Sequence, residues 1–246
     1  MFLADGFEEV EALAPYDVLV RGGVNVKTVC LNEDNFVTSS HKTVLLAKYT
    51  FKEFLKKFEQ EGTSREDVMI FPGGMPGSTN LAACKPLMEL LRRHYDEGGS
   101  VAAICAAPSV VLASALGEER LKGVKMCCYD GFETGLEAAG AEYVKAGCVK
   151  DDDVITSRGA GHAIAFGLEI LAHIKGEEAA RTVAAQIMLW LPVSLSRVPP
   201  LSRRNGRLRP VRVPPGCGSP SIRPLMLSRH WRPFSYPCRS RPPLSC

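Results

Sequence analysis

Acidic residues and lysine are both missing from residues 191–246 of this 246-residue chain. That stretch contains eleven arginines and twelve of the seventeen prolines. Removing those arginines from the thirty basic residues leaves nineteen, against 27 acidic residues in residues 1–190. The formal net charge of +3 therefore combines about −8 over residues 1–190 with about +11 over residues 191–246. The overall basic balance says nothing about the partners of residues 1–190.

Residues 191–246 also lack almost any period-2 or period-3.6 pattern of apolar residues. Two interpretations stay open: an artefact of off-frame translation of a G+C-rich reading frame, or a disordered basic arm that binds nucleic acid or anionic surfaces. The absence of aromatic–basic interleaving favours the artefact, so a nucleic-acid partner is not expected. In either case we expect a disordered segment, because it buries too little apolar surface to offset chain entropy.

Several motifs that would indicate other functions are missing from residues 1–190. No G-x-G-x-x-G follows a predicted strand and no G-x-x-x-x-G-K-[ST] occurs, which argues against a nucleotide-binding enzyme. The six cysteines form no C-x-x-C pair and have no metal-ligand spacing, so we expect free thiols, no metal and a reducing, cytoplasmic setting. No signal peptide or apolar run of membrane-spanning length is visible, so no membrane association is expected.

Apolar runs alternate with helical patterns throughout residues 1–190. This alternation predicts one α/β domain over residues 1–190, a parallel sheet with helices on both faces. We expect residues 80–95 to form one helix, and residues 143–144 and 148–149 to form a small hairpin. Residues 1–4 resemble the last part of a strand whose beginning is missing. The following helix, residues 8–21, is predicted to carry one apolar stripe: Val10, Leu13, Ala14, Val18 and Leu19.

Cys105 is the strongest candidate for a reactive residue. It follows the apolar run 101–104, which predicts a buried strand, and precedes Pro108, which suits the first turn of a helix. Ligands of open α/β sheets bind outside the carboxyl ends of the strands. A helix N-terminus also favours a thiolate, so we expect the pKa of Cys105 to be lowered. The alternative is a buried structural cysteine.

Two further features point toward the same chemistry. Glu11 lies one turn inside the first helix among apolar neighbours, so its side chain is expected to face inward. Gly73 and Gly74 follow the predicted strand 68–71, and glycines there can turn two N–H groups toward one point. Such a pair would stabilise an anionic oxygen or sulfur, although a plain tight turn is the simpler explanation.

Six segments together resemble the ThiJ/PfpI superfamily, specifically its DJ-one branch. The resemblance covers essentially residues 2–190 and implies a flavodoxin-like sandwich, usually a homodimer, with a nucleophile elbow at Cys105. Members are described as glutathione-independent glyoxalases, as deglycases of early glycation adducts and as oxidation-sensing chaperones. The segments are A-D-G-F-E-E-V-E-A (4–12), V-R-G-G-V-N-V (20–26), F-P-G-G-M-P-G (71–77), A-A-I-C-A-A-P (102–108), C-Y-D-G-F-E (128–133) and I-T-S-R-G-A-G (155–161).

The resemblance also implies residue roles. These are a nucleophile at Cys105, a carboxyl partner at Glu11 and backbone donors at Gly74 and Ala106. Arg21 and His41 fall where the branch places dimer-interface residues near the pocket. Tyr129 stands where some members carry a histidine, and we expect either a substrate contact or a core aromatic residue there. Peptidase-type members have histidine directly after the cysteine, whereas this chain has Ala106, which argues against a cysteine peptidase.

We therefore predict a cysteine-dependent enzyme that needs no cofactor. Its substrates would be α-oxoaldehydes such as methylglyoxal and glyoxal, or early glycation adducts of proteins and nucleotides, and its products hydroxy acids. Backbone N–H groups of Gly73, Gly74 and Ala106 would hold the oxyanion, and Glu11 would move the proton. Such an activity would protect against oxidative stress. The alternative is a redox sensor or chaperone that responds to oxidation of Cys105, and the sequence does not separate the two.

Overall fold

The computed structural model describes residues 1–61 and 64–189. The predictions for residues 191–246, a disordered or artefactual tail, lie outside the described residues. Among the described helices, none combines the length and the apolar composition needed to cross a membrane.

The described strands form two main sheets and two ribbons. The larger sheet has the order β10 (Cys148–Asp151), β11 (Val154–Ser157), β7 (Ser100–Ile104), β6 (Val68–Phe71), and only the β10–β11 ladder is antiparallel. The smaller sheet is wholly parallel, in the order β1 (Phe2–Leu3), β2 (Val29–Cys30), β5 (Tyr49–Thr50). The ribbons pair β3 (Phe36–Thr38) with β4 (Val44–Leu46), and β8 (Lys125–Met126) with β9 (Glu142–Tyr143).

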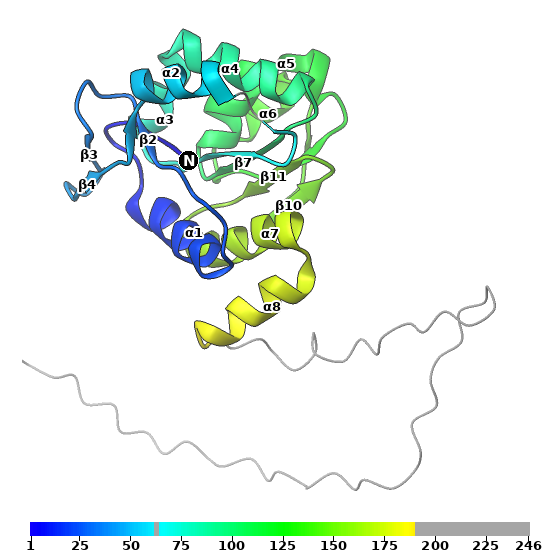
Figure 1. Cartoon of the computed structure of the whole chain (residues 1–246). Coiled ribbons are helices and arrows are strands. Elements are labelled where there is room, and N and C mark those ends of the chain that lie inside the picture. The colour runs from blue at the N-terminus through cyan, green and yellow to red at the C-terminus, as the bar shows by residue number, and fades with distance from the viewer. Residues whose placement is uncertain (62–63, 190–246) are drawn as a thin grey trace, which may run out of the picture. The chain divides into compact units, whose positions relative to one another are not determined.

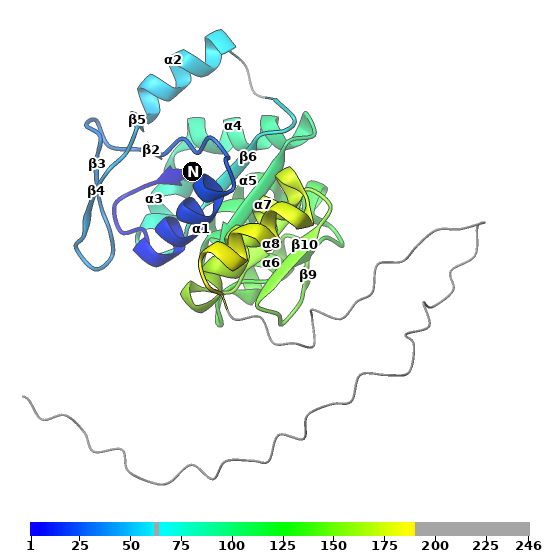
Figure 2. The ribbon, with the colours of Figure 1, turned by 60° about the horizontal axis from the view of Figure 1, so that its bottom comes forward.

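Helices cover both faces, as the alternation of strands and helices predicts (Figure 1). Figure 2 shows one group in front of the sheets: α1 (Glu9–Arg21), α7 (Ala163–Lys175) and α8 (Glu177–Gln186). The other face carries α2 (Phe51–Glu61), α3 (Gly77–Ala83), α4 (Lys85–Asp96), α5 (Ala113–Leu121) and α6 (Glu133–Ala138). The predicted α/β fold is confirmed.

Strand β7 separates two hydrophobic cores because successive side chains point to opposite faces. Val101 and Ala103 pack with the core that includes Leu91 and Leu112. Ile104 packs with the other core, which includes Phe166. All five residues of β7 are buried, as expected for a strand covered on both sides.

Three predictions of local structure are wrong. Residues 80–95 are not one helix: α3 ends at Ala83, and α4 has Pro86 in its first turn, where its missing N–H breaks no bond. β10 forms its hairpin with β11 rather than with β9, because a tight turn at Asp152 allows a four-residue ladder. The stripe on α1 is divided, since Val18 and Leu19 are buried whereas Val10 and Leu13 are exposed.

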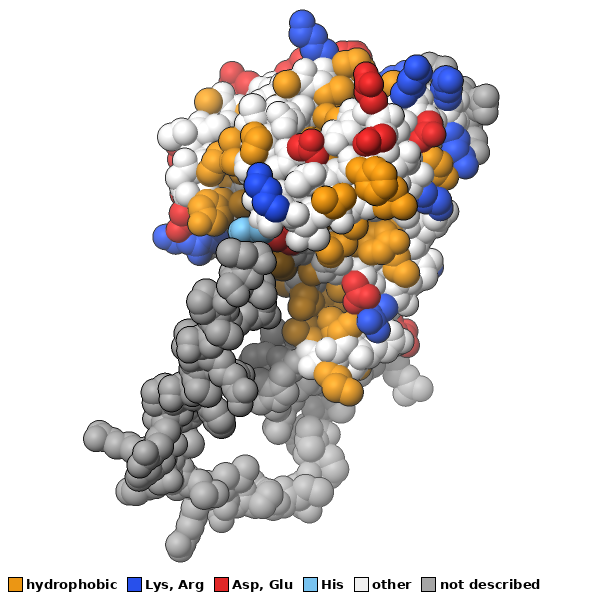
Figure 3. All heavy atoms as spheres, turned by 90° about the vertical axis from the view of Figure 1, so that its left-hand side faces the viewer, with side chains coloured by type: hydrophobic (Ala, Val, Ile, Leu, Met, Phe, Trp, Pro, Cys, Tyr) orange, Lys and Arg blue, Asp and Glu red, His pale blue; other side chains and the backbone are white. Residues whose placement is uncertain are grey.

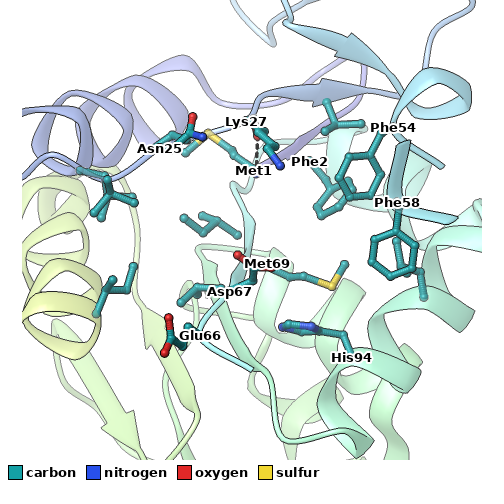
Figure 4. A pocket seen from close by; sticks show the side chains of 18 of the residues that line it. Met1, Phe2, Asn25, Lys27, Phe54, Phe58, Glu66, Asp67, Met69 and His94 are labelled. Atoms are coloured by element: carbon teal, nitrogen blue, oxygen red, sulfur yellow. Dashed lines mark hydrogen bonds between the residues drawn. The ribbon is translucent and has the colours of Figure 1, made fainter. Parts of the chain in front are cut away.

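A cavity of about 360 Å³ lies between the two main sheets (Figure 4). Met1, Phe2, Phe54, Met69 and His94 are among the residues that line it. No ladder joins the two sheets among the described residues, so the predicted single sheet is divided at this place. Stacking of the Phe2 and Phe71 rings, with centroids 5.5 Å apart, connects them at one end.

Candidate active site

Three parallel strands end at one edge of the larger sheet, and each is followed by a segment of the site. Cys105 directly follows β7, Gly73 is the second residue after β6, and Arg158 directly follows β11. The first turn of α1 adds Glu11, which follows β1 of the smaller sheet. This position, outside the carboxyl ends of parallel strands, is where ligands bind in open α/β folds. The cavity of Figure 4 is elsewhere, since neither Cys105 nor Glu11 lines it.

Cys105 adopts a left-handed backbone conformation, with φ of 66°. Its N–H donates to the Ser157 carbonyl at 2.9 Å, and its carbonyl accepts from the Tyr129 N–H at the same distance. The chain then enters a wide helical turn, Pro108–Leu112, which continues as α5. Because an L side chain is unfavourable at positive φ, the surrounding hydrogen bonds must hold Cys105 in place. The half-buried thiol thus sits on an elbow between strand and helix, as predicted, and the positive φ adds strain that the sequence does not indicate.

This strain predicts an effect on stability. Cys105→Gly and Cys105→Ala both remove the thiol, but glycine adopts positive φ without steric cost. We expect Cys105→Gly to be more stable than Cys105→Ala by about 1 kcal/mol in urea unfolding. Equal stability of the two variants would show that the elbow holds no strain.

Glu11 is only 1% exposed and points into the site, as predicted. Its Oε2 accepts a hydrogen bond from the Gly73 N–H at 3.0 Å. The carboxyl group also contacts the Ala160 N–H and the Cys105 thiol. In this structure Glu11 occupies the Gly73 N–H, so donation by Gly73 to a reacting oxyanion stays a prediction.

Gly74 and Ala106 supply the backbone donors that face the sulfur. Their N–H groups hydrogen-bond to Cys105 and favour its ionised form. Gly73 has a steric role beside them: a Cβ there would lie 2.5 Å from the Cys105 Cβ and 2.6 Å from Glu11 Oε2. The close approach of nucleophile and carboxyl depends on glycine at this position.

Burial changes the protonation of both reactive groups. Desolvation raises the pKa of Glu11 from 4.5 to about 7. Desolvation, together with the charge and hydrogen bond of Glu11, raises the pKa of Cys105 to about 12. The expected lowering of the thiol pKa is therefore wrong, because burial outweighs the backbone donors. Protonation of Glu11 removes the charge beside the sulfur, so the two groups titrate as a pair.

The raised pKa of Glu11 predicts a dependence of stability on pH. Between pH 4.5 and 7 the folded protein keeps a proton that the unfolded chain releases, so the unfolding free energy falls as pH rises through this range. The contribution amounts to about 3 kcal/mol for a shift of this size. Because Glu11→Gln cannot titrate there, we expect the wild type to lose stability relative to this variant from pH 4.5 to 7 in urea unfolding. A constant difference across that range would contradict a buried, protonated Glu11.

The other candidate residues differ in how close they lie to this pair. A Cβ built on Gly159 would lie 3.3 Å from the Tyr129 ring and 3.9 Å from Glu11 Oε1, so Tyr129 borders the site. His41 is bonded to Glu9 at 2.9 Å, beside the first turn of α1. Arg21 pairs with Asp17 at the far end of α1, about 15 Å along the helix from Glu11. The roles of Arg21 and His41 near a pocket therefore stay predictions about a dimer.

Sequence reasoning missed Ala160 and Gly159 as parts of the site. Both belong to the quoted segment R-G-A-G, but nothing local indicates that Ala160 contacts Glu11. Among the described residues, one group of metal-ligand type occurs, formed by Glu8, Glu9 and His41 with ligand atoms within 4.8 Å of one another. Two bonds already engage that group, since Glu8 caps α1 by accepting from the Glu11 N–H and Glu9 Oε1 binds His41.

Comparison with known proteins agrees with this geometry. The sequence model of the DJ-1/PfpI family matches residues 1–173. The glutathione-independent glyoxalase DJR-1.2 of Caenorhabditis elegans is 32% identical over 182 residues, which cover 74% of this chain and 90% of that protein. The Parkinson disease protein 7 homolog of Danio rerio is 30% identical over 190 residues, which cover 77% of this chain and 95% of that protein.

Solved structures show the same architecture. Drosophila melanogaster DJ-1beta superposes with a TM-score of 0.68 at 32% identity, covering 77% of this chain and 96% of that one. A cysteine-to-alanine mutant of a DJ-1 superfamily protein from Salmonella typhimurium has the same TM-score at 30% identity, with coverage of 77% and 97%. This likeness supports the flavodoxin-like arrangement predicted from the sequence.

Proposed function

The chain belongs to the DJ-1/PfpI family, and from this premise we propose that it is a glutathione-independent glyoxalase that uses Cys105 as nucleophile. What supports the proposal most is the close approach of the two groups: a Cβ built on Gly73 would lie 2.5 Å from the Cys105 Cβ and 2.6 Å from Glu11 Oε2, beside two backbone donors that favour the ionised thiol. We also propose that early adducts of dicarbonyls on proteins or nucleotides react at the same thiol. The six free cysteines among the described residues suit the reducing cytoplasm that we propose as its location.

The first step joins the substrate to the protein. Sγ of Cys105 attacks the aldehyde carbon, an S–C bond forms, and the thiol proton passes to the Glu11 carboxylate. The N–H groups of Gly74 and Ala106 stabilise the oxyanion that develops, which Glu11 then protonates to give a hemithioacetal. A carboxyl group with a pKa near 7 suits this work at neutral pH, because it can both accept and return a proton.

The remaining steps move two protons and add water. Glu11 removes the hydrogen of the former aldehyde carbon as a proton and returns a proton to the neighbouring carbonyl carbon, while the hydroxyl proton passes from the former aldehyde oxygen to the neighbouring oxygen. The aldehyde carbon is thereby oxidised and the neighbouring carbon reduced, which leaves a thioester on Cys105. Hydrolysis of the thioester releases the hydroxy acid and restores the thiol. The overall reaction consumes one water molecule, so it needs no external oxidant or cofactor.

The direct test is turnover by the purified full chain without glutathione. We expect methylglyoxal to give lactate and glyoxal to give glycolate, followed by proton NMR. If neither product forms, while mild peroxide oxidises Cys105 ahead of Cys84 and Cys148, the redox-sensor alternative replaces the enzyme.

A second proposal concerns self-association. Two groups of exposed apolar side chains gather on the face shown in Figure 3, which carries α1 and the β3–β4 ribbon. Val10, Leu13 and Val20 belong to α1, and Phe36, Val44 and Leu46 to the ribbon. We propose that this face forms a homodimer, as the family resemblance implies, because groups of exposed apolar side chains mark contact sites.

This homodimer proposal predicts the effect of a single charge. Leu13→Glu places a carboxylate among the exposed apolar side chains of α1, so we expect the dissociation constant to rise at least about 100-fold. Light scattering over a range of concentrations measures the change. Thr134→Glu adds the same charge on the exposed side of α6 and should leave the dimer intact. A wild-type chain that is monomeric at high concentration would contradict the dimer.

A further inference from the structure

A two-pronged ion pair joins two of the segments that border the site. Arg158 Nε donates to Asp130 Oδ1 at 2.8 Å, and Arg158 Nη2 donates to Asp130 Oδ2 at 2.5 Å. Asp130 belongs to the segment after β8, and Arg158 to the segment after β11. The proposed chemistry of Cys105 and Glu11 uses neither side chain.

Asp130 and Arg158 are each next in sequence to a residue that borders Cys105 and Glu11. Asp130 follows Tyr129, whose N–H donates to the Cys105 carbonyl at 2.9 Å. Arg158 precedes Gly159, and a Cβ on Gly159 would lie 3.3 Å from the Tyr129 ring. The Tyr129 ring therefore lies against the Gly159 backbone. The Cβ position built on Gly159 is also 3.9 Å from Glu11 Oε1.

The Tyr129 ring lies on the solvent side of the site. Tyr129 is 52% exposed, although its backbone N–H is bonded to the Cys105 carbonyl. Backbone bonds hold the opposite segment, because the Arg158 N–H donates to the Gly147 carbonyl at 3.1 Å. The ion pair is a second side-chain link between these two stretches, since the Cys127 N–H also donates to Thr156 Oγ1 at 2.9 Å.

The Asp130–Arg158 ion pair is not expected to add much to the free energy of unfolding. Asp130 is half exposed, and exposed ion pairs contribute little to folding. Its two-pronged geometry does restrict direction, because guanidinium and carboxylate must stay coplanar. Arg120 and Asp96 make the same two-pronged pair between α4 and α5, at 2.6 and 2.8 Å, with no contact to the site. That second pair provides a matched control.

We propose that Asp130 and Arg158 are positioning residues that hold Tyr129 against Gly159, so that the ring restricts which aldehydes reach Cys105. Small dicarbonyls pass, and those with a bulky substituent next to the reacting carbonyl are held back. The inference deepens the proposed glyoxalase function, and it names substrate size as the property that the site selects.

The test measures access to the thiol and does not require turnover. Cys105 is alkylated with iodoacetamide and with the bulkier 2-iodo-N-phenylacetamide, and its peptide is followed by mass spectrometry. In Asp130→Asn and in Arg158→Gln we expect the bulky-to-small rate ratio to rise about three- to tenfold, with Tm shifted by no more than about 3 °C. Asp96→Asn should leave the ratio unchanged. Tyr129→Ala should raise the ratio equally, and adding Asp130→Asn to it should change nothing more, because both act through one ring.

Turnover supplies a second, separate comparison. If the wild type is active, the ratio of kcat/KM for phenylglyoxal to that for methylglyoxal should rise in Asp130→Asn and stay constant in Asp96→Asn. Alkylation ratios that match those of Asp96→Asn would overturn the positioning role whether or not the chain is an enzyme. A wild type without turnover, but with the expected alkylation ratios, would overturn only the glyoxalase.

Discussion

Replacing Cys105 with alanine is expected to lower dicarbonyl turnover at least about 1,000-fold, because the covalent step then has no nucleophile. The backbone donors at Gly74 and Ala106 remain in this variant, but a water molecule held there is a far weaker nucleophile than a thiol. The measurement is the rate of lactate formation from methylglyoxal by proton NMR.

The control for this variant is another half-buried cysteine. Cys84 lies between α3 and α4, and Cys84→Ala should keep wild-type turnover. Circular dichroism must show that Cys105→Ala is folded. Retention of more than a tenth of the wild-type rate would exclude the covalent mechanism.

Glu11→Gln is expected to lower turnover about 100- to 10,000-fold, because an amide holds the place of the carboxyl group but cannot accept or return a proton. The rate at which the Cys105 thiol is alkylated should change in the opposite direction. Loss of the negative charge beside the sulfur lowers the pKa of Cys105, so alkylation by iodoacetamide at pH 8 becomes faster while turnover becomes slower.

These opposite changes separate a proton shuttle from a structural role. A residue that merely supported α1 would lower both rates together or neither. Glu9→Gln serves as the control, since Glu9 is two residues away on α1 and bonds His41 rather than Cys105. Wild-type turnover in Glu11→Gln would refute the shuttle.

Local patterns were enough to predict the elbow and the inward glutamate. An apolar strand that ends at Cys105 and a proline three residues later define the turn without any distant contact. Apolar neighbours on one helix likewise orient Glu11. The use of the Gly73 N–H by Glu11 could not be predicted, because it joins residues 62 positions apart through the packing of β1 beside β6.

Burial explains why the predicted thiol pKa and the predicted apolar stripe of α1 differ from the structure. Backbone N–H groups at the start of the helical turn do lower the pKa of Cys105, as the sequence predicts. Burial raises that pKa by more, and the degree of burial depends on contacts that the sequence pattern does not reveal. Amphipathic periodicity also does not tell a buried stripe from an exposed one. For that reason the pattern places Val10 and Leu13 on the same stripe as Val18, although only Val18 is buried.

The division of the sheet has a consequence for how activity is lost. Cys105 follows the four-stranded sheet, whereas Glu11 follows the smaller one, whose ladders each join only two residue pairs. Short ladders open at lower free energy than the rest of a fold, so amide protons at β1 and β2 should exchange with solvent sooner than those of β7. On warming, acid and nucleophile would therefore separate while most helices remain intact, and inactivation would precede global melting.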